Sequence, residues 1–448
     1  MNLAILGGGL SGISLAYLLQ ESGAAMAIDI LEREDVPGGL CRSFPFGNVH
    51  YDVGPHIMFS KNSDILKLMV RMLGDNVHKL RRSNRIWHDG RLVKYPFENE
   101  LSALSEPDKQ YCLNAFLNNP YTDYVPQNML QFFLVTFGEG ITNLFLRPYN
   151  EKIWKFDPSL MDTQMVERIP KPPREDIIRS AEGVATEGYV HQLHFFYPKT
   201  GGVESIVRGF IAQLGPGVAI RTGTEVAKLH KAGEKWSVTS SDGAERQYDR
   251  VVSTIPLPTL FRALDPPPPD EVAQAAARLK FNSIIICMLR VKRERLGDNF
   301  AITVADKTVL FHRLSKVNFL FPPEVDDGTT SLLVEVTYRK GDLIDQMNDR
   351  HVVQRIVQDL CRLGFIEDAA DVLADEVTRH PFAYVIYDLA HRQNMATIRR
   401  YCEGELGLTL HGRFGEFEYI NMDQVIEKSM ARCRELADRP IAGNANQA

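Results

Sequence analysis

The chain of 448 residues has few cysteines and no long run of basic or apolar residues. Six scattered cysteines without a CxxC pair or metal-ligand spacing predict neither disulfides nor a metal site, and fit the reduced thiols of a cytoplasmic enzyme; they are Cys41, Cys112, Cys287, Cys361, Cys402 and Cys433. A net charge of −6 without a basic block argues against nucleic acid as a partner. The longest apolar run, residues 284–289, is far too short to cross a bilayer, so we expect no membrane segment. Because the chain opens directly into a predicted strand, we also expect no signal peptide.

Catalytic patterns that rely on side chains alone are also missing. The twelve histidines form no HExxH motif and no paired spacing, and neither a Ser-His-Asp arrangement nor an internal repeat is visible. The length predicts two or three domains, while 44% apolar and 24% charged residues are ordinary for a globular protein. Chemistry by a bound cofactor therefore becomes the first hypothesis.

The first dozen residues carry the strongest motif. The apolar run 2–6 predicts a buried parallel strand, and Gly7, Gly9 and Gly12 follow it at the spacing of a dinucleotide-binding turn. A helix from Ile13 to Glu21 comes next, and its N-terminal N–H groups favour a phosphate. A second strand, 27–31, ends at Glu32, where a carboxylate can accept from ribose hydroxyls.

A second glycine pair, Gly38-Gly39, follows this acid and is followed in turn by Arg42. This order resembles the extended fingerprint of glutathione-reductase-like flavoproteins, in which a Gly-Gly turn and an Arg lie beside the pyrophosphate of FAD. The predicted cofactor is therefore FAD.

The rest of the chain predicts an α/β protein with a discontinuous Rossmann-like FAD-binding domain, a helical domain and an antiparallel sheet domain. Helical periodicity predominates from residue 100 to 195, and strands are expected at 84–88, 91–95, 283–291, 300–304, 308–314 and 331–338. The domain ranges that follow are 1–80, 196–265 and 405–448 for FAD, 100–195 for the helical domain, and 81–99 with 266–404 for the sheet.

Aromatic and cationic residues gather in a few further segments. Residues 145–154 end a helix with an aromatic face and the amide of Asn150. Arg168 and Arg313 lie in different predicted domains; two guanidinium groups reaching one cavity would suit a diphosphate. For either arginine alone, a structural role is the simpler interpretation.

Together these segments resemble the UDP-galactopyranose mutase family over nearly the whole chain, with features of both its eukaryotic and bacterial branches. The matching segments are Gly54-Pro55-His56, Tyr95-Pro96-Phe97, residues 145–154, Glu167-Arg168, Tyr197-Pro198 with Gly201-Gly202, Arg313, and Arg413-Phe414-Gly415 with Tyr419. A general amine oxidase or protoporphyrinogen oxidase would share the glycine fingerprint and Val251 to Pro256, but not these segments.

The resemblance implies a role for each matching residue. Catalytic roles would fall to Arg168, Arg313, His56, Tyr384 and Tyr419, with the arginines and tyrosines on the diphosphate and His56 beside the isoalloxazine ring. The cofactor would contact Gly7, Gly9, Ser11, Gly12, Glu32, Arg33, Gly39, Leu40, Val226, Arg413, Met422 and Asp423. The nucleotide end of the substrate would contact Tyr95, Phe97, Glu98, Asn150 and Trp154.

The family's reaction interconverts the pyranose and furanose forms of a nucleotide sugar, with N5 of reduced FAD attacking the anomeric carbon and the nucleoside diphosphate leaving transiently. The resemblance thus implies an isomerase acting on UDP-galactose, with a place in cell-surface glycan biosynthesis. NAD(P)H is one candidate reductant, and the oligomeric state stays open, a homo-oligomer included.

Three departures from the family pattern leave the base and the sugar open, one of which is that residues 385–387 lack the family's proline-rich loop. Glu98 stands where eukaryotic members have Gln, and Asn421 stands where bacterial members have Asp. Two alternatives remain: an FAD-dependent oxidoreductase of the amine oxidase or protoporphyrinogen oxidase type, and a flavoprotein without catalytic activity.

Overall fold

The N-terminal strand β1 (Asn2–Leu6) lies at the centre of a five-stranded parallel sheet. The computed structural model describes residues 1–437 except 168, 170, 185, 188–192 and 322–326. The sheet order is β20 (Thr409–Leu410), β13 (Arg250–Ser253), β1, β2 (Ala27–Leu31) and β9 (Val218–Arg221). Strands from the beginning, middle and end of the chain thus form one sheet, so the predicted discontinuity is confirmed.

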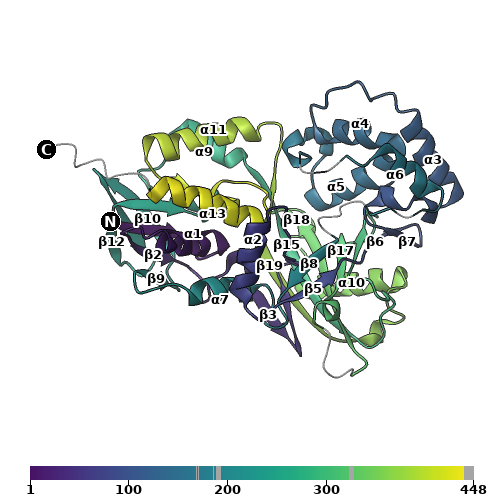
Figure 1. Ribbon diagram of the computed structural model, residues 1–448, viewed down its shortest axis with the longest axis horizontal. Helices are drawn as coiled ribbons and strands as arrows, with labels where there is room; N and C mark the ends of the chain where they lie inside the picture. The colour runs from purple at the N-terminus through teal and green to yellow at the C-terminus, as the bar shows by residue number, and fades with distance from the viewer. Residues whose placement is uncertain (168, 170, 185, 188–192, 322–326, 438–448) are drawn as a thin grey trace.

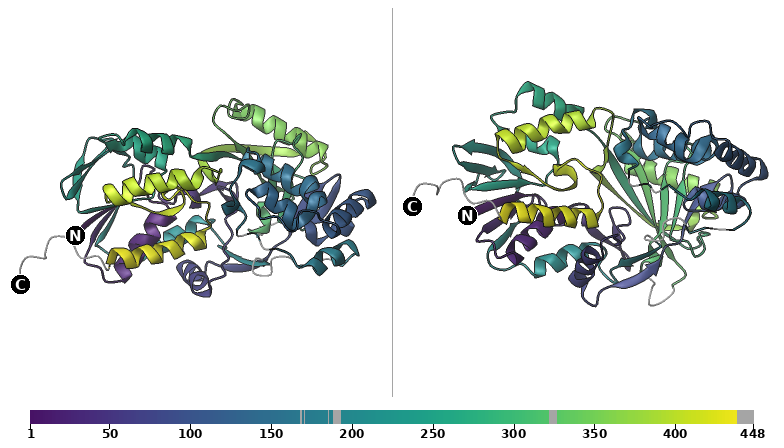
Figure 2. Two further views of the ribbon diagram at one scale, coloured as in Figure 1. Left: turned by 90° about the horizontal axis from the view of Figure 1, so that it is seen from above. Right: turned by 45° about the horizontal axis from the view of Figure 1, so that its top comes forward.

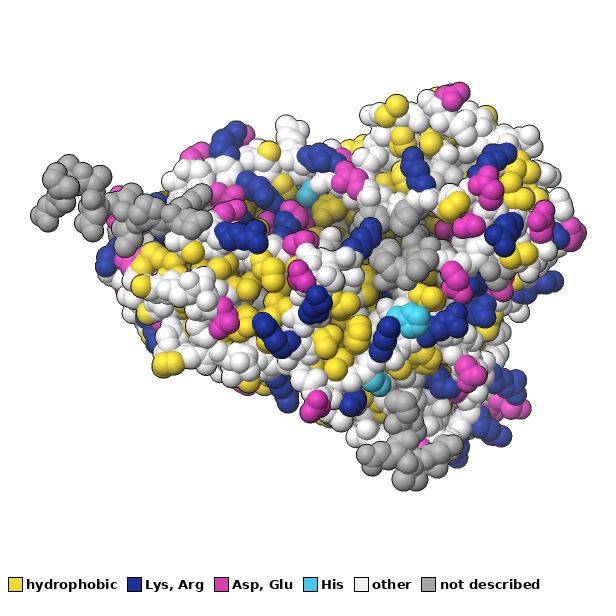
Figure 3. Space-filling view, viewed as in Figure 1, with side chains coloured by type: hydrophobic (Ala, Val, Ile, Leu, Met, Phe, Trp, Pro, Cys, Tyr) yellow, Lys and Arg dark blue, Asp and Glu magenta, His cyan; other side chains and the backbone are white. Residues whose placement is uncertain are grey.

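Alternate residues of β1 pack on opposite faces of this sheet. Leu3 and Ile5 pack with helices α1 (Leu10–Glu21), α2 (Ser63–Leu73), α7 (Glu204–Ala212) and α13 (Met422–Ala437). Ala4 and Leu6 face a small sheet of β10 (Val226–Ala232), β11 (Lys235–Ser240), β12 (Glu245–Tyr248) and β14 (Leu264–Asp265). Both faces of β1 are therefore buried, as a continuous apolar strand requires. Apolar side chains also show on the outer surface over α1 and α2 (Figure 3), where Leu18 and Met72 are only partly buried.

A seven-stranded sheet forms the centre of the molecule (Figure 1). Its order is β19 (Val372–Ile386), β15 (Lys280–Val291), β18 (Thr330–Tyr338), β17 (Arg313–Lys316), β16 (Ala301–Val304), β6 (Asn84–His88) and β7 (Arg91–Lys94). All neighbours are antiparallel except β16 and β6. One face packs on α10 (Asp349–Arg362) through Ile285, Val334 and Val336.

The expected strand at 308–314 is wrong in its position. Residues 306–309 form a turn in which the Asp306 carboxylate accepts from the Thr308 backbone and hydroxyl, and β17 begins only at Arg313. Because side chains alternate along a strand, this start point decides that Arg313 and Ser315 share one face of the sheet.

The helical part lies beside the sheet (Figures 1 and 2) and contains α3 (Glu106–Leu117), α4 (Met129–Ile141), α5 (Arg147–Trp154) and α6 (Arg174–Ala181). A π-helical stretch, Thr142–Leu146, joins α4 to α5. The helix bends at Gly138, whose φ of 71° would strain any residue with a side chain. A Cβ at this position would also lie 2.5 Å from the Ala115 carbonyl oxygen, so the close approach requires glycine. By length and composition, the helix Met129–Trp154 is long and apolar enough to cross a membrane. The search for continuous apolar runs did not detect it. Half of its most apolar stretch is buried inside the protein, as in the core helix of a globular domain.

The domain range 266–404 is not a single unit of the structure. α9 (Asp270–Arg278) and α11 (His391–Arg399) pack on each other, and α9 also packs on α8 (Leu257–Ala263), beside the cofactor sheet (Figure 1). Their apolar faces belong to the cluster that holds Val226 and Leu229, so burial rather than chain order places them.

The remaining elements are short connections around the two sheets. β3 (Ser43–Phe46) pairs with β4 (Val49–Asp52), and β5 (His78–Arg81) pairs with β8 (His194–Tyr197). α12 (Gly412–Gly415) precedes α13. Five of the six cysteines are buried, and Cys361 is partly exposed.

Candidate active site

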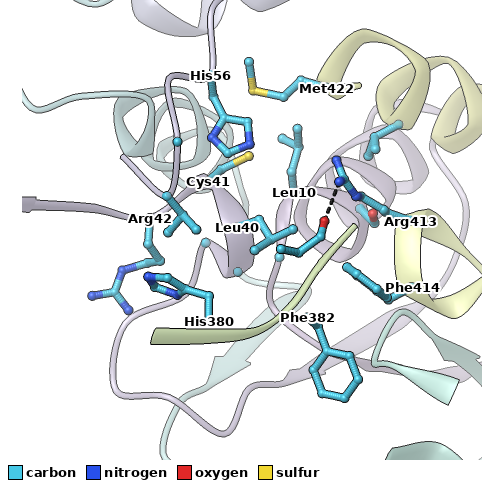
Figure 4. Close-up of a pocket in the computed structure, with 18 of the residues that line it drawn as sticks. Leu10, Leu40, Cys41, Arg42, His56, His380, Phe382, Arg413, Phe414 and Met422 are labelled. Atoms are coloured by element: carbon cyan, nitrogen blue, oxygen red, sulfur yellow. Dashed lines mark hydrogen bonds between the residues drawn. The ribbon is translucent and has the colours of Figure 1, made fainter. Parts of the chain in front are cut away.

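A cavity of about 760 Å³ runs from the glycine turn after β1 to one face of the seven-stranded sheet, where Ile284, Ala301 and Arg313 line it. Its wall takes residues from the cofactor sheet, from β19 and from the segment before α13. In Figure 4, Leu40, Cys41 and His56 face Met422 and Arg413 across this space. A site built from segments this far apart in sequence exists only in the folded chain.

The two glycine turns form a cradle at one end of the cavity. Gly7 has φ +105°, and a Cβ at Gly12 would lie 2.2 Å from the Gly7 carbonyl oxygen, so neither position tolerates a side chain. Gly38 N–H donates to the Gly8 carbonyl, which fixes the second turn beside the first. Gly9 precedes α1 without a side-chain cap, which leaves first-turn N–H groups for an anion. Gly7, Gly9, Ser11, Gly39 and Leu40 line the cavity, whereas Gly12 lies behind it.

Glu32 lies at the end of β2 where a ribose would need an acceptor. Its buried carboxylate accepts from the backbone N–H of Gly8 at 2.7 Å and of Glu34 at 2.9 Å. Each oxygen keeps a second lone pair for a hydroxyl donor. Arg33 and Val226 line the same end, but the Arg33 side chain pairs with Glu34 and is 52% exposed.

Arg42 lies at the rim beside the second glycine turn. Its Nε donates to the buried Glu204 carboxylate at 3.0 Å, and its Nη1 donates to the Val36 carbonyl at 2.9 Å. The guanidinium is therefore held in place and lines the cavity on the cradle side.

His56, Arg413, Met422 and Asp423 surround the middle of the cavity. Burial, together with the charges of Arg413 and Arg313, lowers the pKa of His56 to about 3, so its imidazole is neutral near pH 7. Arg413 donates to the carbonyls of Ala383 and Ile420, and its guanidinium lies 4.6 Å from the Tyr419 ring centre. Burial raises the pKa of Asp423 at the start of α13.

Arg313 enters the cavity from β17 and is held by Glu335 of β18, which the sequence did not single out. Arg313 Nε and Nη2 both donate to the Glu335 carboxylate, and Glu335 is fully buried. Against the cost of burial, the Glu335 charge raises the pKa of Arg313. This bidentate pair uses two of the five N–H donors and leaves Nη1 for a ligand.

Tyr384 and Tyr419 line the cavity near Arg313, and Trp154 supports both from behind. The Trp154 ring meets their rings edge-on, with centroids 5.6 Å and 5.4 Å apart. The Trp154 indole donates to Asn150 Oδ1, and Asn150 in turn donates to the Leu146 carbonyl. The Asn150 amide is thus bonded within its own helix, and neither residue lines the cavity.

The other residues predicted for the nucleotide end also lie behind the cavity wall. Phe97 is fully buried and stacks on Phe145, which stacks on Tyr149. Glu98 is 4% exposed, and Tyr95 lies close enough to Arg82 and Arg313 for their charges to act on its pKa. Packing of the helical part explains these positions, because the aromatic residues form its core. Arg168 lies outside the described residues.

Several residues of the cavity wall were missed from sequence: Phe59, Arg82, Asn84, Phe300, Ala301, Ser315 and His380. Cross-strand register brings Asn84, Ala301 and Ser315 together. No local sequence motif predicts that register. Among the described residues, no group of three His, Cys, Asp or Glu side chains could hold a metal ion.

The buried Glu98 gives a pH-dependent prediction. Burial raises the pKa of its carboxyl to about 7, whereas an unfolded Glu titrates near about 4.3. Between these values the folded chain alone binds the proton, so the free energy of unfolding falls as pH rises. Glu98→Gln removes this pH-dependent loss. The free energy of unfolding of the variant, relative to that of the wild type, is therefore expected to rise by about 3 kcal/mol from about pH 5 to about pH 8. Urea unfolding at a series of pH values measures this difference.

The control for this measurement is Glu182→Gln, at an exposed position directly after helix α6. A stability difference between Glu98→Gln and the wild type that does not change with pH would contradict a buried neutral carboxyl.

The Rossmann-like sheet, the double glycine cradle and the ribose acceptor define an FAD-binding flavoprotein, and their spacing fits the cofactor. The chain belongs to the flavin-containing amine oxidoreductase family, whose model matches residues 10–394.

Comparison with solved structures supports the same fold. The chain is similar to a crystal structure of reduced UDP-galactopyranose mutase, with 25% identity and a TM-score of 0.86 over 97% of this chain and 93% of that one. It is also similar to a protein from Exiguobacterium sp. 255-15 with the provisional name protoporphyrinogen oxidase (17% identity, TM-score 0.76, 97% and 98% covered). A fatty acid isomerase from P. acnes has 15% identity and a TM-score of 0.65, with 97% and 98% covered. The last two likenesses concern the fold alone.

Proposed function

We propose that the protein is a flavin-dependent mutase that interconverts the pyranose and furanose forms of a nucleotide sugar, with UDP-galactose as the first candidate substrate. The observation that carries this proposal is Arg313 with Tyr384 and Tyr419 in the wall of the same cavity that holds the glycine cradle. A cation and two phenols suit a departing diphosphate, and an oxidase of amines has no need for them. The 25% identity with UDP-galactopyranose mutase over nearly the whole chain supports the same choice.

When bound and reduced, FAD supplies the nucleophile for the anomeric carbon. Arg313 is oriented by Glu335, so its free Nη1 can donate to a phosphate oxygen without rearrangement. Burial keeps the Tyr384 phenol protonated by raising its pKa, so it remains a hydrogen-bond donor to the same group. Trp154 fixes both tyrosine rings.

Neutral His56 fits this reaction. It lines the cavity without adding a positive charge to the electron-rich reduced ring, and Arg413 and Arg313 already lie near enough to lower its pKa. Arg413 is held by two backbone carbonyls, so it too is fixed before a ligand binds.

A direct assay tests the mutase proposal. Protein reduced with dithionite is expected to convert UDP-galactopyranose to its furanose form, seen as a new peak in chromatography of the reaction mixture. Oxidised protein is expected to be inactive, because its flavin cannot act as a nucleophile. Equal activity in both redox states would contradict the proposal.

An FAD-dependent oxidoreductase of the amine oxidase or protoporphyrinogen oxidase type is the second candidate, and membership of the flavin-containing amine oxidoreductase family supports it as well. It predicts that an amine or porphyrinogen reduces the flavin anaerobically, bleaching its visible absorbance, while nucleotide sugars stay unchanged. A colourless purified protein would exclude both candidates.

A further inference from the structure

A second cavity, of about 470 Å³, lies at the end of α5 and shares no lining residue with the first. Three segments form it: the end of α5 with the residues that follow, the turn after β16, and the loop between β18 and α10. A volume of this size admits a small organic molecule. No residue predicted to contact the cofactor or the nucleotide sugar lines this cavity, so it is separate from the candidate active site.

Three lysines line the second cavity: Lys152 and Lys155 at the end of α5, and Lys307 in the turn after β16. Lys152 is buried, and its Nζ donates to the carbonyls of Val304 at 2.9 Å and Asp306 at 2.7 Å. An ammonium group has three N–H donors. Within the described residues these bonds use two of them, so one donor is left for a ligand.

Lys155 lies directly after α5, at a position that many helices give to glycine. Its φ of 49° is in the left-handed region, where a side chain is unfavourable. It forms no ion pair and no side-chain hydrogen bond with any residue that the structure describes, and the charge of Asp342 acts on it only from beyond ion-pair distance. Burial lowers the pKa of its ammonium, because part of the hydration of the charge is lost. An anion in the cavity would compensate for that loss.

Two acidic side chains also line the cavity, and both already have partners. Glu151 pairs with Arg147 and with Lys307. The Asp157 carboxylate accepts from the backbone N–H of Ser159 at 2.9 Å, so it caps the short helical turn that follows. Three lysines and two carboxylates leave the wall with an excess of positive charge.

Apolar side chains form the rest of the wall, among them Phe156, Val309 and Ile344. The Phe156 ring centre lies 5.7 Å from the guanidinium of Arg339 and 5.9 Å from Nζ of Lys280, which adds two cations near this wall. A ligand that fits both parts of the cavity therefore carries a negative charge at one end and an apolar group at the other.

We propose that the second cavity binds an organic phosphate, with the phosphate held by the three lysines and its apolar group packed on Phe156 and Ile344. Lysine ammonium groups bind phosphate as point charges, without the planar geometry that an arginine fork requires. The inference does not depend on the proposed mutase function, because the two cavities share no residue.

Phenyl phosphate is a suitable probe, because it joins a phosphate to a single apolar ring. Calorimetric titration of the FAD-loaded protein, with UDP in excess to occupy the first cavity, is expected to show binding of phenyl phosphate. Lys155→Met is expected to weaken this binding on the order of tenfold to a hundredfold, as for a lost hydrogen bond to a charged group. Inorganic phosphate, which lacks the ring, is expected to bind more weakly than phenyl phosphate.

The pH dependence of binding distinguishes this site from an arginine site. Burial, together with the charges of Lys155 and Arg362, lowers the pKa of Lys152 to about 7, against the opposing charges of Asp306 and Asp359. A bound phosphate stabilises the ammonium and raises this pKa, so the affinity is expected to fall from about pH 7 to about pH 9. A guanidinium stays charged over this range. A constant affinity would therefore contradict a contact with Lys152.

The control is Lys67→Met, which removes the same charge from an exposed side chain of α2 that pairs with Asp64 and lines neither cavity. It is expected to leave the affinity unchanged. Lys307→Met is a second variant of the site, and it is expected to weaken binding less, because Lys307 already pairs with Glu151. Flavin absorbance and urea unfolding show whether each variant is folded.

Three further outcomes would overturn the inference. Binding of phenyl phosphate that disappears when UDP is added would assign it to the first cavity. An affinity that Lys155→Met leaves unchanged would remove the second cavity as the site. Tighter binding of benzoate than of phenyl phosphate would replace the phosphate with a carboxylate. None of these results bears on the mutase assay, which tests the proposed function separately.

Discussion

Arg313→Met is expected to remove activity and also to destabilise the fold. Its partner Glu335 is fully buried and would keep a charge without a counterion, which costs about 3–5 kcal/mol in comparable pairs. Loss of the donor to the diphosphate is expected to lower kcat by about 10²–10³-fold. Urea unfolding and the chromatographic mutase assay measure the two effects separately.

The double variant Arg313→Met with Glu335→Leu separates the two roles of this pair. Replacing both partners with apolar side chains removes the buried charge, so most of the lost stability is expected to return. Activity is expected to stay low, because the phosphate donor is still missing. Full activity in the double variant would show that Arg313 does not act on the substrate.

Arg290→Met is the matched control for stability. Arg290 lies on β15 of the same sheet, and its partner Asp327 is 40% exposed. A pair this accessible to water contributes little, so a change below about 1 kcal/mol is expected. An equal loss at both arginines would mean that burial of Glu335 is not the cause.

Gly12→Val is expected to yield protein that no longer retains FAD. The added Cβ would lie 2.2 Å from the Gly7 carbonyl oxygen and 3.0 Å from Ile5 Cγ2, so α1 must move away from β1. That movement displaces the N–H groups of the first turn from the cradle, and overpacking costs about 1–3 kcal/mol. The ratio of visible flavin absorbance to protein absorbance measures cofactor retention.

Gly404→Ala is the control for this substitution. No atom lies within 4 Å of a Cβ at this glycine, so retention of FAD is expected to match the wild type. If Gly12→Val bound FAD in full, the close approach of α1 to β1 would not be what forms the cradle.

The sequence determined the cofactor half because its signals are local. The glycines between β1 and α1 and the acid at the end of β2 lie within about thirty residues, where a turn and a helix start follow from steric limits of the backbone alone. The strands expected at 84–88 and 91–95 are also present, as the antiparallel pair β6 and β7.

Only the tertiary structure decided the composition of the reacting end. Strand register places Glu335 opposite Arg313 and places Asn84 and Ser315 on either side of Ala301. This register depends on the packing of the whole sheet and not on neighbours in sequence. The same packing put Phe97 among the aromatic rings of the helical core, where burial stabilises it. Asn150 forms its hydrogen bonds within its own helix, so neither residue lines the cavity. The sequence shows which residues are candidates for the site. Packing between segments that are distant in sequence decides which of them line the same cavity.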